Sequence, residues 1–318
     1  MLVLLLSGCR DYNELNMQEL VNHAGVDFEN GEVSVCVLCD GGKEEKPLVR
    51  KSVGESFFEA VREMSGRSDK KLYWGHTETV VFGEAASFEA FPQTLDAILR
   101  ARDVFSDVVP VAVRGGKAED VLSSVSGEGA PNILEAFANS GNSRRFEALP
   151  LWKLLRSLEL YGACVIPTVV KEGEKYILSG GAVMTELGRV GYLSEEQMLL
   201  RSLLTDKTAG GYLPTIRTDD GRAVSFEILA NDLELSGKES SFTIRNSLTL
   251  SPAEVLGSVS EEEMKSLSEE YLTRSYRELI AFCKTSGFGN VLNLRGAKGN
   301  AEVEVLPDVK ISNVLGGR

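Results

Sequence analysis

Cys9 is the residue whose surroundings point most clearly to a specific chemistry. It follows Leu6, Ser7 and Gly8, and the sequence becomes polar at Arg10. An apolar segment can enter a membrane, small residues allow a signal peptidase to approach the backbone, and a thiol can accept a diacylglycerol. Residues 1–9 therefore predict a bacterial lipoprotein processing site, or lipobox, in which Cys9 is lipidated and becomes the new N-terminus.

Residues 1–7 could instead form a first core strand, with Cys9 as a small apolar residue. The absence of alternation in these residues and the abrupt polarity change after Cys9 favour the lipobox. A signal peptide normally starts with a basic region, but no Lys or Arg precedes Arg10. Because a bilayer span needs roughly 20 residues, we expect a native start upstream of Met1 or a trimmed chain.

Cys36 and Cys39 form a Cys-x-x-Cys pair within an apolar run. If this run is a strand, the two side chains lie on opposite faces and about 10 Å apart, which is too far for a disulfide. No second cysteine pair or neighbouring histidine completes a zinc site. We expect structural cysteines here and predict no metal site and no cofactor.

The remaining candidates for catalysis are weak. His23 and His76 are the only histidines, and both are expected to be structural. The glycine pair before Lys117 lacks a phosphate-loop pattern and is expected to be a turn. A lipid-anchored hydrolase would need paired carboxylates, and the candidates lie at expected caps or turns: Glu195, Glu196, Asp219, Asp220, Glu261, Glu262 and Glu263. The sequence therefore predicts no catalytic residues and no enzyme.

Composition narrows the classes of partner. With 318 residues the chain has room for about two domains. Its net charge of −13, from 34 basic and 47 acidic residues, opposes nucleic-acid binding and docking on anionic lipid through basic patches. No later run of 18 apolar residues predicts a membrane span. Attachment to a membrane would depend on the lipid of Cys9, because two or three acyl chains anchor a protein stably.

The first half alternates strands and helices. Asn30 and Gly31 predict a hairpin turn, and Ser56 with Glu59 predicts a capping box at a helix start. The other expected elements are strands at 72–74, 79–83, 108–113 and 163–170, and helices at 88–102, 117–122 and 151–160. We assign residues 10–175 to an N-terminal α/β domain.

The second half predicts a C-terminal α+β domain over residues 176–318. Ser194 with Gln197, and Ser260 with Glu263, predict capping boxes. Strands are expected at 181–184, 190–193, 212–217, 223–229, 241–248, 301–306 and 309–314. The longest helix, 261–284, has an apolar side formed by Met264, Leu267, Tyr271, Leu279 and Phe282. The predicted class is a multi-domain α+β fold of mixed sheets flanked by helices, with this long helix packed on a sheet.

Six features in order resemble the Ger(x)C family, the C-subunit lipoproteins of nutrient germinant receptors in spore-forming bacteria. They are Cys9-x-Asp11-x-x-Glu14-Leu15, Gly54-x-Ser56-Phe57-Phe58-Glu59-Ala60, Gly75-His76 before Gly83-Glu84, Gly116-x-Ala118-Glu119-Asp120, Gly181-Ala182-Val183 with Val190-Gly191-Tyr192-Leu193, and Ser286-Gly287-Phe288-Gly289. The resemblance departs at Arg10, where the family commonly has Trp, and in the short tract after Gly289.

The resemblance implies a non-enzymatic subunit, lipid-anchored through Cys9 at the outer face of the spore inner membrane. Its implied partners are an integral-membrane A subunit and a transporter-like B subunit. The alternative is a solute-binding lipoprotein of a transporter, although such proteins usually have two doubly wound lobes. The hairpins expected in the second half favour the receptor subunit.

Overall fold

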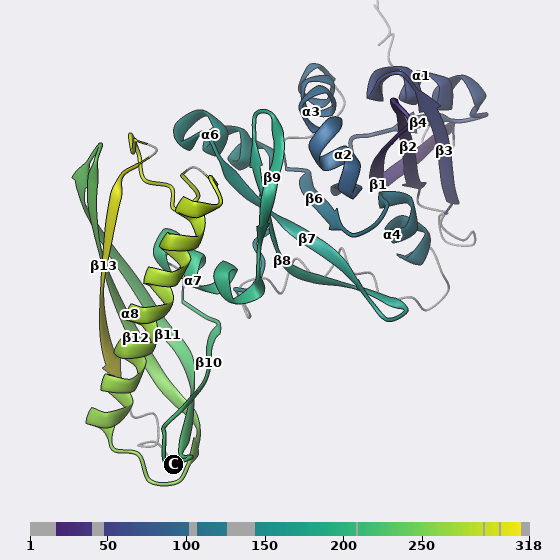
Figure 1. Cartoon of the computed structure of the whole chain (residues 1–318). Coiled ribbons are helices and arrows are strands. Elements are labelled where there is room, and N and C mark those ends of the chain that lie inside the picture. Colours follow the sequence, from purple (N-terminus) through teal and green to yellow (C-terminus); the bar gives the residue numbers. More distant parts are fainter. Residues whose placement is uncertain are drawn as a thin grey trace, which may run out of the picture.

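The protein contains two β-sheets joined by a helix (Figure 1). The computed structural model describes residues 17–39, 48–101, 107–125, 144–207, 209–288, 290–298 and 300–312. The first sheet contains β1 (Gln18–Glu29), β2 (Glu32–Cys39), β3 (Leu48–Gly54), β4 (Lys71–Tyr73), β5 (Thr79–Phe82), β6 (Val109–Arg114), β7 (Cys164–Glu172), β8 (Lys175–Thr185) and β9 (Gly188–Leu193). The second contains β10 (Tyr212–Arg217), β11 (Ala223–Lys238), β12 (Ser241–Leu256) and β13 (Glu302–Ile311).

The first sheet has a parallel centre and antiparallel flanks. Its order is β3-β2-β1-β5-β6-β7-β8-β9, with β4 pairing β1, and β1, β5, β6 and β7 run parallel. One face is covered by α1 (Phe57–Arg67), α2 (Glu84–Glu89), α3 (Phe91–Arg100) and α6 (Leu151–Tyr161). The opposite face is covered by α4 (Ala118–Val125). The predicted turn between β1 and β2 is confirmed, because Asn30 and Gly31 both have positive φ.

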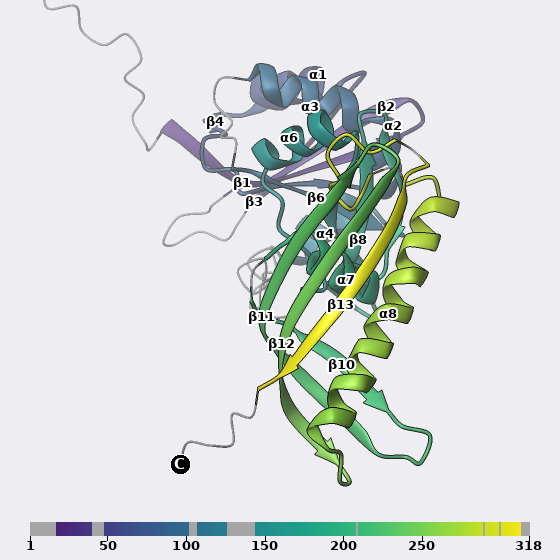
Figure 2. The same ribbon diagram turned by 90° about the vertical axis from the view of Figure 1, so that its left-hand side faces the viewer.

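The second sheet is built on one long hairpin. β11 and β12 pair antiparallel along nearly their whole lengths, and β13 then pairs parallel to β12. A parallel neighbour requires a crossover connection, which α8 (Glu261–Thr285) provides. Figure 2 shows α8 lying alongside β13 over most of its length.

The helix α7 (Glu195–Thr205) connects the two sheets. Its buried leucines belong to the same apolar cluster as Val165 and Val183 of the first sheet and Phe226 and Leu248 of the second. Ser194 caps α7 in the predicted capping box: Gln197 N–H donates to Ser194 Oγ at 3.2 Å, and Ser194 N–H donates to Gln197 Oε1 at 2.8 Å. One continuous core therefore spans the junction.

The predicted α+β class, with mixed sheets and a long C-terminal helix, is confirmed. Several boundaries differ. The predicted helix 88–102 is two helices that meet at Ala90, β11 and β12 extend well beyond the predicted strands, and the last two predicted strands form the single strand β13. Pro307 does not interrupt β13 because this strand lies at the sheet edge, where a missing N–H is tolerated.

The junction between the halves also lies elsewhere. The predicted boundary after residue 175 falls at the start of β8, because the preceding turn connects two antiparallel neighbours of one sheet. The first sheet continues to Leu193 and the second begins at Tyr212. In α8, Met264 and Leu279 are buried as predicted, whereas Phe282 is exposed.

Candidate functional site

The predicted lipidation residue, Cys9, lies outside the described residues, which begin at Met17. Its assignment stays a prediction. The other candidate residues lie in the described part of the chain.

The four described cysteines are buried and none forms a disulfide. Cys36 and Cys39 both lie in β2, three residues apart. Burial raises the pKa of each thiol to about 12, so each is protonated at neutral pH. A protonated thiol is a poor nucleophile and metal ligand, and within the described ranges no group of three metal-ligating side chains occurs.

The histidines contact structural neighbours. His23 is buried in β1, and its Nδ1 lies 2.9 Å from Thr79 Oγ1 of the adjacent strand. His76 packs edge-on against the ring of Tyr73.

Four of the seven acidic candidates make contacts in two separate groups. Asp220 and Glu263 converge on one guanidinium: Arg222 Nε donates to Asp220 at 2.8 Å, and Arg222 Nη1 donates to Glu263 at 2.8 Å. Hydrogen bonds from Thr218 and Arg222 lower the pKa of Asp220, and those from Arg222 lower the pKa of Glu263. A general acid needs the opposite shift. In the other group, Glu195 accepts from Arg145 and Glu196 accepts from Tyr271.

Three of the family-like motifs meet where the parallel strands β5 and β6 end. Glu84 begins α2, its Oε2 accepts from Gly115 N–H at 2.9 Å, and its Oε1 accepts from Tyr192 Oη at 3.2 Å. The Tyr192 ring also contacts two guanidiniums, with Arg189 at 4.5 Å and Arg114 at 5.0 Å from its centroid. Burial raises the pKa of Tyr192 to about 12. We call these five residues the carboxyl-edge cluster.

A carboxylate of the chain already occupies the start of α4, where the glycine pair could have bound an anion. Asp27 accepts from Ala118 N–H at 2.8 Å and from Glu119 N–H at 3.0 Å. Gly83 makes this possible, since a Cβ there would lie 2.0 Å from Asp27 Oδ1. The predicted turn at Gly115 and Gly116 is therefore a structural junction that Asp27 stabilises.

The fifth and sixth motifs contact each other across the junction of the two halves. A Cβ on Gly191 would lie 2.3 Å from the Phe288 ring, so this glycine of β9 accommodates the aromatic residue that follows α8. Phe288 is buried and stacks edge-on against Phe282. The motif glycines thus mark close packing between elements.

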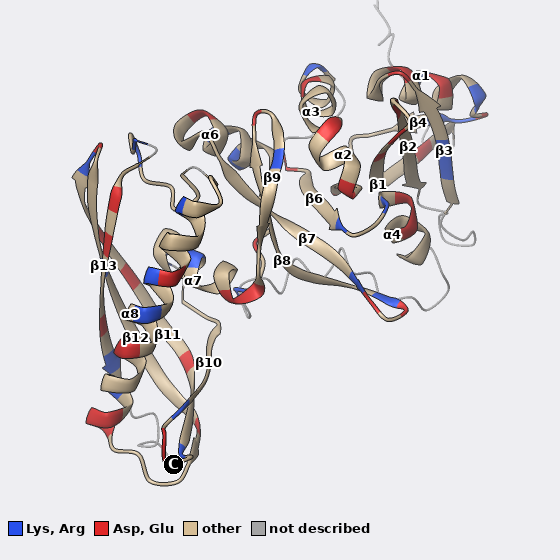
Figure 3. Cartoon of the chain, in the orientation of Figure 1, with Lys and Arg blue, Asp and Glu red and all other residues tan. Residues whose placement is uncertain are grey.

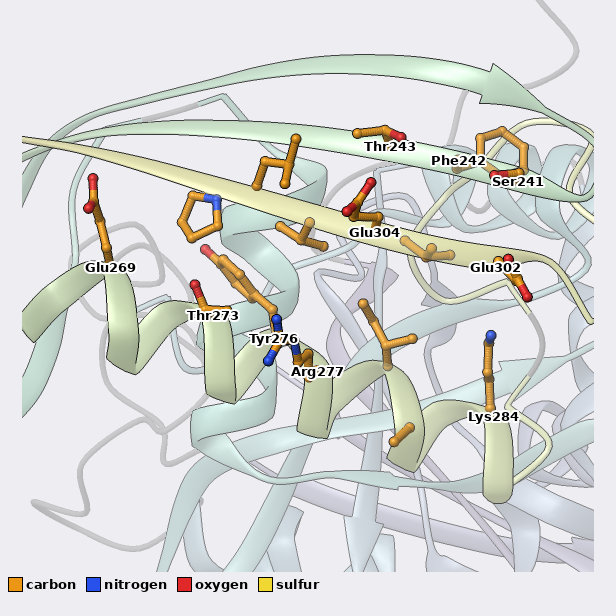
Figure 4. Close-up of a pocket in the computed structure, with 16 residues that line it drawn as sticks. Ser241, Phe242, Thr243, Glu269, Thr273, Tyr276, Arg277, Lys284, Glu302 and Glu304 are labelled. Atoms are coloured by element: carbon orange, nitrogen blue, oxygen red, sulfur yellow. The ribbon is translucent and has the colours of Figure 1, made fainter. Parts of the chain in front are cut away.

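An open groove of ≈ 910 Å³ runs between α8 and β13 (Figure 4). Arg277 and Lys284 lie on its helix side, and Glu302 and Glu304 on its strand side. The end of the edge strand is covered in part, because Glu269 accepts from Val309 N–H at 3.0 Å. The groove carries both signs of charge and none of the acids predicted for a hydrolase.

A buried polar network in the second half was not anticipated from the sequence. Asn246 is completely buried; its amide donates to Asn231 Oδ1 at 2.7 Å and its Oδ1 accepts from Tyr276 Oη at 2.6 Å. Asn231 in turn donates to Leu203 O at 3.1 Å, at the end of α7. Arg201 was also missed: it is buried in α7 and donates to Val291 O at 2.8 Å. The available signal was a polar residue at an inward position of an otherwise apolar element.

Acidic side chains are spread over both halves and are interspersed with basic ones (Figure 3). Several are neutralised in surface ion pairs, among them Lys117 with Glu29 and Lys51 with Glu119. None of the described helices combines the length and apolar character needed to cross a bilayer.

Comparisons with known proteins agree with this arrangement. Residues 11–171 match the family model described as "Spore germination protein N-terminal domain". The fold is similar to that of the GerBC protein crystal structure, with a TM-score of 0.59 at 16% sequence identity, over 91% of this chain and 97% of that one. No match was found among curated proteins. The family match ends in β7, so the carboxyl-edge cluster combines residues inside it with Arg189 and Tyr192 beyond it.

Proposed function

Starting from the finding that the chain belongs to the Ger(x)C family of spore germination proteins, we propose that it is the C subunit of a nutrient germinant receptor. In this proposal a diacylglycerol on Cys9 holds it at the outer face of the spore inner membrane. There it acts without catalysis, through contact with the integral-membrane A subunit and the transporter-like B subunit. The observation that carries the proposal is the family match over residues 11–171.

The geometry supports action by contact. Of the groups that the sequence offered for chemistry, the cysteines are buried and protonated at neutral pH. Asp220 and Glu263 are held in their charged forms by Arg222. In the carboxyl-edge cluster Glu84 accepts hydrogen bonds from Gly115 and Tyr192, and at the neighbouring start of α4 the Asp27 carboxylate occupies the N–H groups. These arrangements stabilise a surface and supply no poised nucleophile or acid.

The solute-binding alternative receives less support from the fold. Its expected site is a cleft between two doubly wound lobes, whereas the second sheet is a long hairpin flanked by antiparallel β10 on one side and parallel β13 on the other. The groove beside β13 lies along one edge of that sheet. We therefore favour the receptor subunit.

The anchor is tested by Cys9→Ala in spores, compared with Arg10→Ala as a matched control next to it. We expect Cys9→Ala to leave the inner-membrane fraction while Arg10→Ala remains, because only the thiol can carry the lipid. Nutrient-triggered germination should fail in spores that carry Cys9→Ala and proceed in spores that carry Arg10→Ala. Retention of the Cys9→Ala protein in the membrane fraction would contradict the anchor.

A further inference from the structure

Large apolar side chains are exposed on three of the helices that cover one face of the first sheet and on the β8–β9 turn. Phe58 of α1 is 60% exposed, Leu99 of α3 51%, Trp152 of α6 43%, and Leu187 in the β8–β9 turn 84%. In Figures 1 and 2 α1, α3 and α6 lie along the upper side of the molecule, and Figure 1 shows the β8–β9 turn rising between α3 and α6. We call these four residues the upper apolar surface. Single exposed apolar residues are ordinary, but three of these residues belong to helices that cover the same face of the first sheet.

Two of the aromatic residues are accompanied by cations. The Arg62 guanidinium lies 5.1 Å from the Phe58 ring centroid, and Lys153 Nζ lies 5.5 Å from the Trp152 ring. An aromatic ring next to a long cationic side chain suits the membrane–water boundary, because the ring enters the apolar layer while the charge reaches the headgroups.

The charge of these helices contrasts with that of the whole chain. Together α1, α2, α3 and α6 contain five cations, Arg62, Arg67, Arg100, Lys153 and Arg156, and six carboxylates, Glu59, Glu63, Glu84, Glu89, Asp96 and Glu159. Their net charge is therefore −1, whereas the chain carries −13. An anionic membrane repels acidic surfaces by about 1 kcal/mol per charge near the headgroups. Such a membrane therefore repels this nearly neutral helical side only weakly.

The start of the described chain lies near the same helices. Gln18 of β1 pairs with Lys71 of β4, a strand that directly follows α1. Cys9 precedes Met17 by eight residues, and a chain of that length reaches at most about 26–29 Å. A lipid on Cys9 would therefore hold the membrane close to α1.

We propose that the upper apolar surface rests on the phospholipid bilayer, with Phe58, Leu99, Trp152 and Leu187 in the headgroup boundary. The second sheet, which extends downward in Figures 1 and 2, then projects away from the membrane. This orientation rests on the proposed anchor for its tether. It leaves β11, β12, β13 and α8 free to meet partner domains above the bilayer.

The two tryptophans allow a direct test with the full chain. The protein, produced without export, is coupled through the Cys9 thiol to vesicles of phosphatidylcholine and phosphatidylglycerol that contain a maleimide lipid. The other four cysteines are buried, and their raised pKa values disfavour coupling. Trp152 is exposed, whereas Trp74 packs against the core.

We expect brominated lipids to lower the Trp152 emission of Trp74→Phe about twofold, since interfacial side chains lie about 5–10 Å into the headgroup boundary. The emission of Trp152→Phe, which reports Trp74, should change little. Combining Phe58→Ser and Leu187→Ser with Trp74→Phe should reduce the quenching, whereas combining Phe282→Ser, at an exposed position of α8, with Trp74→Phe should not.

Unquenched Trp152 in vesicle-coupled protein would overturn the proposal, as would equal loss of quenching in the Phe282→Ser control. Because the thiol coupling supplies the tether, these outcomes are independent of acylation in the cell. Absence of the lipid from the native protein would instead contradict the proposed anchor and leave the contact surface to be judged by the quenching.

Discussion

The two halves of the molecule differ in where their polar side chains form hydrogen bonds. In the first half the conspicuous polar contacts are charged and lie where β5 and β6 end, as in Glu84 with Tyr192 and Asp27 with α4. In the second half a neutral network of Asn231, Asn246 and Tyr276 lies within the core. The difference indicates that the first half is held by junctions between elements, whereas the second depends on complete pairing inside a long, narrow sheet.

The largest effect on stability should come from Asn246→Ala. This change removes the partners of the Tyr276 hydroxyl and the Asn231 amide oxygen, and we expect it to lower the free energy of unfolding by about 3–4 kcal/mol. Arg245→Ala is the matched control, because Arg245 is the exposed neighbour on the opposite face of β12. Urea unfolding of both variants makes the comparison, and equal costs would show that the network contributes little.

Gly83→Ala tests the corresponding junction of the first half. Its Cβ would displace the Asp27 carboxylate from the N–H groups of Ala118 and Glu119. We expect a loss of about 2–3 kcal/mol, since charge-assisted hydrogen bonds at a helix start are removed. Gly116→Ala is the control, because its Cβ would make ordinary contact at 3.4 Å. A similar loss in both variants would argue against a specific role for Asp27.

The helix caps should give smaller effects. Ser194 makes both bonds of a capping box, whereas Ser260 accepts from Glu263 N–H and the Glu263 carboxylate binds Arg222 instead. We therefore expect Ser194→Ala to cost about 1–1.5 kcal/mol and Ser260→Ala about 0.5–1 kcal/mol. Denaturant midpoints of the two variants check that Ser194→Ala costs more stability than Ser260→Ala. Ser266→Ala, at an exposed position within α8, is the control. A larger loss of stability in Ser260→Ala than in Ser194→Ala would contradict this expectation.

The contributions of Asp27 in the first half and Glu263 in the second half to the free energy of unfolding should change with pH in opposite directions. Burial raises the pKa of Asp27, so the stability linked to its protonation is present at acid pH and is lost as pH rises through the folded pKa. The hydrogen bond from Arg222 lowers the pKa of Glu263, so its contribution is present above the unfolded pKa and is lost as pH falls through the folded one.

The cost of Asp27→Asn should therefore shrink between pH 3 and 6, whereas that of Glu263→Gln should grow over the same interval. Unfolding curves measured across this range give both trends. Trends of the same sign would show that one of the two carboxyl environments has been misassigned.

Local sequence signals predicted much of the fold. Asn30 with Gly31 marked the first hairpin, and Ser194 with Gln197 marked α7, because turns and caps depend on neighbouring residues. The cap at Ser260 was only half right, since a distant residue, Arg222, draws away the Glu263 carboxylate. The lengths of β11 and β12 were underestimated because their outer ends are exposed and lack apolar alternation.

The candidate site was less accessible to sequence reasoning. Gly83, Glu84, Gly191 and Tyr192 were visible as motifs, but their meeting depends on the order of nonadjacent strands. Asn246 was visible only as a polar residue at an inward position of an apolar strand, and its hydrogen-bond partners could not be identified from the sequence because they lie on α8 and β11. Parallel pairing of β12 with β13 likewise has no signature within either strand.

The central claim is that the chain acts by contact within a membrane receptor. Affinity capture of the native protein from detergent-solubilised spore inner membranes, followed by mass spectrometry, tests it most directly. The account predicts that an integral-membrane A-type subunit and a transporter-like B-type subunit are recovered in comparable amounts. Recovery of the chain without either subunit, under conditions in which A and B still copurify with each other, would contradict it.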